Sequence, residues 1–331
     1  MRAKFTPRGL TRRDLLRLWV GALATVPAAG LAGCAGGTPL RVAVQPFCGY
    51  QFLSLAQEQG DLRGEGVQLL PVATYADAVS SLRRGEADAA PMTLDQVLAL
   101  RELGLPLIVV MVFDMSAGGD VALARPGIET PAQLRGQRIG VEATSLGTIL
   151  LAKLLEAGGL TRADVTVVPM EDDHFAAWNR GDLDALLTYE PALSQLRRRG
   201  LVPIFDSRAL PQTIVDVLAV DEYAARRHED ALRALIAAHF RVLGRWRSNP
   251  IDTAYRLAGY FGVDADHVPA VINGLDLPDA VYNRHYLADP APELRRSASD
   301  LGDILLRAGL LKRPPMLDGL FVPDYLPVGD A

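Results

Sequence analysis

Short apolar runs alternate with helically spaced apolar positions along much of this chain. Between residues 41 and 90 this pattern predicts strands and helices in the order 41–45, 50–59, 67–71, 76–84 and a short strand after Gly85. The same order returns at 138–141, 146–157, 165–169, 175–180 and after Gly181. An offset of 96–98 residues superposes the two stretches, placing Val42 on Ile139, Pro71 on Pro169 and Gly85 on Gly181. We therefore predict two similar α/β lobes, each a parallel sheet covered by helices.

Two further apolar runs suggest how the chain passes between these lobes. A buried strand is expected at 107–113, and the segment 114–120, which contains two glycines, interrupts it before 121–124 resumes. A second crossing is expected at 214–220, after which helices at 230–247 and 293–308 dominate. We therefore expect lobe one at 40–116 plus 214–331 and lobe two at 117–213.

The N-terminus has the features of an export signal. Six basic residues precede an uncharged apolar run at 18–33, which is shorter than a comfortable membrane span. The segment 11–17 resembles a twin-arginine signal, and Leu31-Ala32-Gly33-Cys34 resembles a bacterial lipobox. We predict a lipoprotein signal peptide at 1–33, a diacylated Cys34 that anchors the protein, and a tether at 34–39. An ordinary signal or a membrane helix is the alternative.

Composition and charge exclude several classes of function. The 331 residues carry a formal charge of −5, and removal of residues 1–33 takes away six basic residues and one acidic residue, which leaves −10. An acidic chain without a basic stripe gives no reason to bind nucleic acid. Cys48 has no disulfide partner if Cys34 is acylated, and it is interpreted as a small buried hydrophobe or a reactive thiol. Nucleophile, phosphate-loop and CxxC signatures are missing from the sequence.

The duplication indicates where a ligand would bind. Ligands of open α/β sheets lie beyond the carboxyl ends of the strands. Two lobes joined by two crossings should face these loops across one cleft and close on a small molecule. The predicted ligand-binding residues are Gly49, Tyr50, Tyr75, Thr93, Thr144, Ser145, Gly147, Asp173, Tyr189 and Glu190.

Each prediction has a structural alternative. Thr144 and Ser145 open a helix, where they either donate to a ligand or simply cap the helix. Glu190 either accepts from a ligand nitrogen or acts as a helix-start charge before Pro191. The two tyrosines either cover a ligand or pack in the core. Asp173 is more plausibly a helix cap, and Asp172-Asp173-His174 lacks further ligands for a metal, so no metal is expected.

Several motifs resemble the solute-binding proteins of ABC importers, in the branch for nitrate, taurine, alkanesulfonates and thiamine precursors. They cover about residues 40–310. The motifs are Arg41-Val42-Ala43-Val44, Gly49-Tyr50, the segment 84–89, the segment 130–141, Gly181-Asp182-Leu183-Asp184-Ala185 and Tyr189-Glu190-Pro191-Ala192. The resemblance implies the bilobed periplasmic-binding-protein type II fold, two α/β lobes joined by two crossover strands, and delivery of a ligand to an ABC permease. The export signal agrees with an exported, lipid-anchored protein, periplasmic or on the cell-surface side of a bacterial membrane.

The ligand is not fixed by the resemblance. The predicted cleft offers Asp95, Glu142, Asp173 and Glu190 but no obvious arginine, which favours a neutral, aminated or zwitterionic ligand. An aliphatic sulfonate, taurine or nitrate is the alternative. We expect a monomer without cofactor and without enzymatic activity. An enzyme similar to thiamine-pyrimidine synthases is disfavoured, because that family needs a cysteine-rich iron motif and a lysine for pyridoxal phosphate. A ligand-sensing lipoprotein without a permease stays open.

Overall fold

The computed structural model describes residues 37–171, 173–288 and 292–328. The predicted signal peptide at 1–33, the lipidation residue Cys34 and the first residues of the tether lie outside the described residues, as does Asp172. The chain from Pro39 onward forms one compact unit, and the description below concerns that unit. The described part of the chain contains no helix that is both long and apolar enough to cross a membrane.

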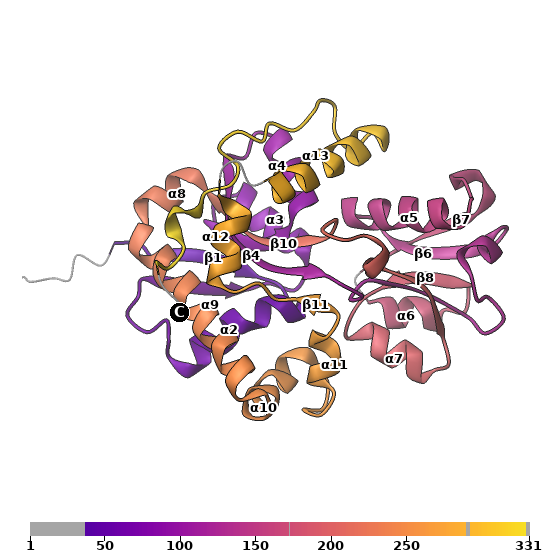
Figure 1. Cartoon of the computed structure of the whole chain (residues 1–331), viewed down its shortest axis with the longest axis horizontal. Coiled ribbons are helices and arrows are strands. Elements are labelled where there is room, and N and C mark those ends of the chain that lie inside the picture. The colour runs from indigo at the N-terminus through magenta and orange to yellow at the C-terminus, as the bar shows by residue number, and fades with distance from the viewer. Residues whose placement is uncertain (1–36, 172, 289–291, 329–331) are drawn as a thin grey trace, which may run out of the picture. The chain divides into compact units, whose positions relative to one another are not determined.

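Two β-sheets organise this unit (Figure 1). In spatial order, the six-stranded sheet contains β11 (Leu275–Asp276), β4 (Leu107–Ser116), β10 (Val215–Asp221), β3 (Ala89–Thr93), β1 (Leu40–Val44) and β2 (Val67–Pro71). The five-stranded sheet contains β7 (Thr166–Met170), β6 (Arg138–Glu142), β8 (Ala185–Thr188), β5 (Val121–Ala124) and β9 (Val202–Asp206). The fold is α/β, as predicted.

The predicted duplication is confirmed in the strand order. β2-β1-β3 and β7-β6-β8 are equivalent orders, and the strands within each trio run parallel. The sheets are not parallel throughout, however, because β10 lies antiparallel to β3 and β4, and β5 lies antiparallel to β8 and β9. The chain crosses between the sheets as extended strands and enters each neighbouring sheet from the opposite direction, so both sheets are mixed.

Each of the two repeats contains the same pair of hydrogen bonds between its first strand and the residue before its third strand. The Arg41 amide donates to Asp88 Oδ2 at 2.9 Å, and the Asp88 amide donates to the Arg41 carbonyl at 2.8 Å. In the second repeat the Arg138 amide donates to Asp184 Oδ2 at 2.8 Å, and the Asp184 amide donates to the Arg138 carbonyl at 2.9 Å. The Asp-Ala motifs of the sequence therefore fix the start of the first strand in each repeat.

One crossing differs from the expectation. β4 continues through Asp114 to Ser116 instead of ending at Phe113, because Asp114 pairs with Asp216 in the ladder with β10. The turn to β5 comes afterwards, where Gly118 has a φ of +112°, a conformation that favours glycine. The apolar run correctly predicted β4, but the charged Asp114 led to a predicted end at Phe113, three residues too early.

Helices follow the strands and then dominate the C-terminal part. In the two repeats they are α2 (Gln51–Gln59), α3 (Tyr75–Arg83), α4 (Leu94–Glu102), α5 (Ser145–Ala157), α6 (His174–Asn179) and α7 (Ala192–Arg198). After β10 come α8 (Glu222–Arg227), α9 (Glu229–Ser248), α10 (Pro250–Phe261), α11 (Val268–Ile272), α12 (Ala280–Leu287) and α13 (Pro292–Arg307). Short 3₁₀ turns include η1 (Cys48–Tyr50) and η4 (Ser207–Ala209). The helices predicted at 230–247 and 293–308 match α9 and α13 closely.

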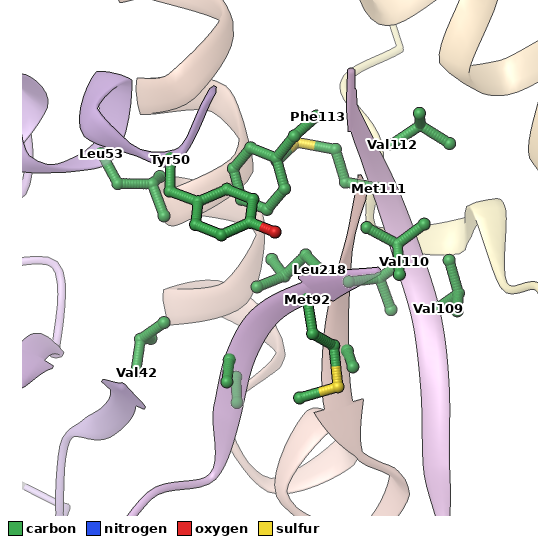
Figure 2. Packing of buried hydrophobic residues seen from close by; sticks show 14 of the residues in the cluster. Val42, Tyr50, Leu53, Met92, Val109, Val110, Met111, Val112, Phe113 and Leu218 are labelled. Atoms are coloured by element: carbon green, nitrogen blue, oxygen red, sulfur yellow. The ribbon is translucent and has the colours of Figure 1, made fainter. Parts of the chain in front are cut away.

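The largest apolar cluster surrounds the six-stranded sheet. Figure 2 shows part of it, where Tyr50 and Phe113 lie next to each other and Met92 and Leu218 pack nearby. The ring centroids of Tyr50 and Phe113 are 5.3 Å apart. Ile149 of α5, a helix of the five-stranded sheet, belongs to the same cluster. Two smaller clusters pack against the five-stranded sheet. The packing therefore continues from one sheet to the other at α5.

Candidate functional site

The strand ends of the two sheets meet through two side-chain contacts. Ser145, the first residue of α5, donates its hydroxyl hydrogen bond to Asp95 Oδ2 in the first turn of α4. Phe47 and Tyr189 form an edge-on ring contact with centroids 6.2 Å apart. Asp95 is only 2% exposed, so its carboxyl lies inside this contact. The loops beyond β1, β3, β6 and β8 therefore come together, as the duplication predicts.

A pair of buried carboxyls lies on the two crossing strands. Asp114 of β4 and Asp216 of β10 are register partners, with 0% and 3% of their surface exposed. The Tyr50 hydroxyl donates to Asp216 Oδ1. Neither oxygen of Asp114 meets a donor among the described residues. The two carboxyls can hydrogen-bond to each other only when one of them holds a proton.

The electrostatics of this region are negative. Burial raises the pKa of Asp216 to about 7 and that of Asp120 to about 6, and it also raises the pKa values of Asp95 and Asp114. After burial, neighbouring carboxylates contribute: the charge of Asp120 raises the pKa of Asp216, and the charge of Glu142 raises that of Asp120. Among the described residues, no lysine or arginine forms an ion pair with any of the four aspartates.

A second polar network lies on the five-stranded sheet. His174 Nε2 lies 2.6 Å from Glu142 Oε1, and His174 Nδ1 lies 3.0 Å from the Thr188 hydroxyl. The Tyr189 hydroxyl donates to the same Glu142 oxygen at 2.8 Å. His174 is buried, and its ring also packs edge-on against Tyr189. These contacts fix the Glu142 side chain at the end of β6.

Four predicted residues come from the first repeat. Gly49 lies against the Asp114 carboxyl, and a Cβ there would stand under 3.0 Å from Oδ2. Tyr50 is in the core, where burial raises its pKa well above the usual value. Burial and then the charge of Asp95 raise the pKa of the half-buried Tyr75. Thr93 is the N-cap residue of α4. Its amide donates to Gln96 Oε1 at 3.0 Å, and its buried hydroxyl has no hydrogen-bond partner among the described residues.

Three predicted residues open α5. The Gly147 amide donates to the Thr144 hydroxyl at 3.0 Å, so Thr144 caps the helix. Ser145 instead spans the two sheets through its bond to Asp95. A Cβ on Gly147 would lie under 3.0 Å from the Glu142 carbonyl oxygen, so the close approach of α5 to β6 requires glycine there.

The other three predicted residues form local contacts. Asp173 is exposed and caps α6 by accepting from the Ala176 amide at 2.8 Å. Glu190 accepts from the Ser194 amide at 3.1 Å and from the Ser194 hydroxyl at 2.7 Å. Tyr189 lies between Phe47 and Glu142, as described above. Both carboxylates thus have the structural role that was the alternative for each, and their roles in binding stay predictions.

Sequence reasoning left several residues of this region out of the site. These are Phe47, Asp114, Asp120, His174 and Asp216, whereas Asp95 and Glu142 are expected in the cleft from the sequence. A signal was present for two of them, because Asp114 and Asp216 each stand in an otherwise apolar strand, where an ionisable side chain is rare without a function.

The molecule has three further features to which no binding role is assigned. Cys48 is buried, and burial followed by the charge of Asp114 raises its pKa well above the usual value, which confirms a buried thiol. A surface cavity of about 350 Å³ is lined by residues of α5, the segment before β10 and α13, including Lys153 and Arg307. Among the described residues, Asp264, Asp266 and His267 form one group with metal-ligand spacing. All three are exposed, and we assign no ion to them.

Comparisons with known proteins place this arrangement in a family. The taurine-binding periplasmic protein of Escherichia coli (strain K12) is 23% identical over 209 residues, which are 60% of this chain and 65% of that relative's length. The periplasmic aliphatic sulphonate binding protein SsuA from Escherichia coli has a TM-score of 0.69 at 17% identity, over 86% of this chain and 92% of that chain. The desulfurization enzyme DSZB has a TM-score of 0.63 at 20% identity, over 86% and 97%.

These solved structures show that the chain has the two-lobed α/β fold of periplasmic binding proteins. The family model described as NMT1/THI5 like matches residues 50–251, more than half of the sequence. The chain belongs to the NMT1/THI5-like family.

Proposed function

We propose that this protein is an exported solute-binding protein that captures one small molecule between its two sheets and delivers it to an ABC permease. The family, the fold and the taurine-binding relative support the proposal. In this proposal lobe one consists of 40–116 plus 214–331, lobe two consists of 117–213, and the two close by motion at the crossing strands. Closure is driven by ligand contacts to both lobes, because only a difference in affinity shifts such an equilibrium.

The acidic contact between the sheets carries the proposal for the ligand. Asp95, Asp114 and Asp216 are buried together, and a bare anion placed among them would be repelled. A ligand with an amino or amidino group would supply the donors that these carboxyls need. We therefore favour a neutral, aminated or zwitterionic ligand. Taurine, an aliphatic sulfonate or nitrate is the second candidate, and the taurine-binding relative favours taurine in particular, which carries both an ammonium and a sulfonate group.

We also propose that the protein is not an enzyme. DSZB shows that this fold can carry an enzyme, so the argument rests on side chains. Cys48 is buried with a raised pKa, whereas a nucleophilic cysteine needs a lowered one. Lys153 of α5 forms an ion pair with Glu156 at 3.0 Å. Two cysteines and three lysines in the whole sequence do not fit the iron motif and pyridoxal phosphate lysine of thiamine-pyrimidine synthases.

Location and partners are part of the same proposal. The export signal and the lipobox support an anchor on Cys34, on the periplasmic or cell-surface side of a bacterial membrane. The partners are the small molecule, the permease and the membrane, and we expect the protein to act as a monomer without a cofactor.

Two linked measurements test the proposal. The protein, purified under native conditions from an exporting host, is first analysed by native mass spectrometry for a bound small molecule. It is then screened by thermal shift against taurine, alkanesulfonates, nitrate, aminopyrimidines and riboflavin-like compounds. A ligand at 100 times its Kd should add about 2.7 kcal/mol to the free energy of unfolding. Absence of any co-purified molecule together with no shift across the panel would contradict the proposal.

A further inference from the structure

The carboxyl pair of Asp114 and Asp216 contains buried acceptor oxygens that no hydrogen-bond donor satisfies in the described residues. Both side chains are buried, and they face each other across neighbouring antiparallel strands. Tyr50 satisfies one oxygen of Asp216. The oxygens of Asp114 have no donor in the described part of the protein. Buried polar atoms are almost always paired, so an unpaired carboxyl beside a second carboxyl calls for a cationic or proton-bearing group.

The surroundings add negative charge from several elements. Asp95 on α4, Asp120 after β4 and Asp276 on β11 contribute charge to the pair, and Cys48 and Tyr50 of η1 face it as neutral groups. Glu190 of the other sheet acts electrostatically on Cys48, which places a further carboxylate near the pair. The charges that act most strongly on these two aspartates come from acidic residues, and none of the described arginines or lysines forms an ion pair with either aspartate.

We propose that Asp114 and Asp216 form a cation subsite within the ligand site. This subsite binds a protonated amine or amidine, which replaces the proton that the two carboxyls share. The inference rests on the proposed solute-binding function and deepens it. An ammonium group has three donors, and the two oxygens of Asp114 and the free oxygen of Asp216 supply acceptors for them. The pair stands on the crossing strands, so a ligand held there touches the segments that connect the two lobes.

The exchange balances in protons and charge. Before binding, the pair holds one proton and one net negative charge. The ammonium enters with its positive charge, both carboxyls become ionised, and the displaced proton passes to the buffer. The pKa of Asp216 near 7 makes this exchange observable around neutral pH.

Gly49 fits this subsite. A Cβ at position 49 would lie under 3.0 Å from Asp114 Oδ2, so a side chain there would press on the carboxyl that the ligand needs. The glycine lies in η1, directly after the loop that follows β1. It leaves the backbone close to Asp114 without a side chain over it.

The test compares probes that differ by one amino group. Isothermal titration measures binding of taurine and ethanesulfonate, and of 4-aminopyrimidine and pyrimidine, at pH 7 in phosphate and in Tris buffer. The wild-type protein should bind at least one amino probe about ten-fold or more tightly than its partner without the amino group. The difference in heat between the buffers should correspond to release of up to one proton for taurine, which enters as an ammonium. 4-Aminopyrimidine is mostly neutral at pH 7, so it would take its proton from the pair and release none to the buffer.

Two variants assign that difference to the pair. Asp114→Asn should lower the affinity for the amino probe about ten- to a hundred-fold, abolish proton release and leave the other probe unchanged. Asp216→Asn serves as the second variant if Asp114→Asn does not fold, as judged by circular dichroism. Asp230→Asn, at an exposed carboxylate in the first turn of α9, is the matched control and should change nothing.

The possible outcomes separate the inference from the function. Equal affinity within both probe pairs, unchanged binding in Asp114→Asn, or binding of taurine without proton release would each overturn the subsite. Failure of every amino probe to bind would overturn it as well. A co-purified ligand without nitrogen would overturn the subsite but leave the solute-binding function standing. Absence of any co-purified ligand together with no thermal shift across the panel would instead count against that function.

Discussion

The Ser145 hydroxyl donates a hydrogen bond to the buried carboxylate of Asp95, and this bond joins helix starts that belong to different sheets. Each residue follows a strand of its own repeat, β3 for Asp95 and β6 for Ser145. The bond therefore depends on how the sheets approach each other. Its donor is lost when the sheets separate, and the Asp95 carboxyl is then open to water.

Ser145→Ala should shift the protein towards a more open arrangement. A hydrogen bond to a charged group contributes about 1.5–3 kcal/mol, so its removal should weaken closure by about that amount. Small-angle X-ray scattering of the ligand-free protein should show a larger radius of gyration than the wild type. Ser54→Ala is the control, because Ser54 donates within α2 to Gln51. An unchanged radius for Ser145→Ala would show that this bond does not hold the sheets together.

Gly147→Ala should destabilise the protein. The added Cβ would overlap the Glu142 carbonyl oxygen, and overpacking of this kind costs about 1–3 kcal/mol. Gly244→Ala is a matched control inside α9, where a Cβ meets no atom within 4 Å, and it should instead stabilise by about 0.4–1 kcal/mol. Urea unfolding measures both, and a loss of stability in Gly244→Ala or none in Gly147→Ala would contradict the packing described.

His239→Leu should remove a pH-dependent loss of stability. His239 is 1% exposed among aromatic rings, and burial lowers its pKa from 6.5 to about 3. Below pH 6.5 His239 is protonated in the unfolded chain but stays neutral in the folded protein. This residue therefore lowers the free energy of unfolding progressively as the pH falls from 6.5 towards 3. At pH 5 the cost is about 2 kcal/mol.

The leucine variant should therefore gain more stability over the wild type at pH 5 than at pH 7.5, as measured by urea unfolding at both values. The comparison at each pH cancels the opposite contribution of Asp120 and Asp216, whose raised pKa values reduce stability as the pH rises through 6 to 7. His267→Gln, at an exposed histidine, is the control. A difference between variant and wild type that does not change with pH would show that His239 is not buried in its neutral form.

Glu190→Gln tests the two roles of this residue. Its carboxylate receives the Ser194 amide and hydroxyl, so the variant should lose about 0.5–2 kcal/mol of stability, as caps do. If Glu190 also contacts a ligand nitrogen, taurine affinity should fall too, and calorimetry measures that. Loss of stability without loss of affinity would leave Glu190 as a cap only, and unchanged stability would contradict the capping contacts.

Cys34→Ser should release the protein from membranes. The lipobox predicts that Cys34 carries the lipid, and stable anchoring needs the two acyl chains that are attached through its thiol. Membrane fractionation of the exporting host measures the change, with Cys48→Ser as the control. A serine variant that remains membrane-bound with its signal cleaved would overturn the anchor.

The sequence predicted the repeats well because local patterns encode them. Strand, helix and the Asp88 and Asp184 motifs recur at one offset, and the structure confirms the same topology twice. Prediction from the sequence failed where a residue pairs with another residue that is far away along the chain. Asp114 looked like the end of a strand because its partner, Asp216, is about a hundred residues away, and no local pattern reveals that ladder. Ser145 could be placed at a helix start, but its bond across to Asp95 depends on the approach of the two sheets.

A crystal structure of the protein with its co-purified ligand tests the central claim most directly. We predict one small molecule that contacts residues of both sheets and places a nitrogen within about 3 Å of a carboxyl oxygen of Asp114 or Asp216. A ligand that touches only one sheet, or that occupies the surface cavity beside Lys153 and Arg307, would contradict the account.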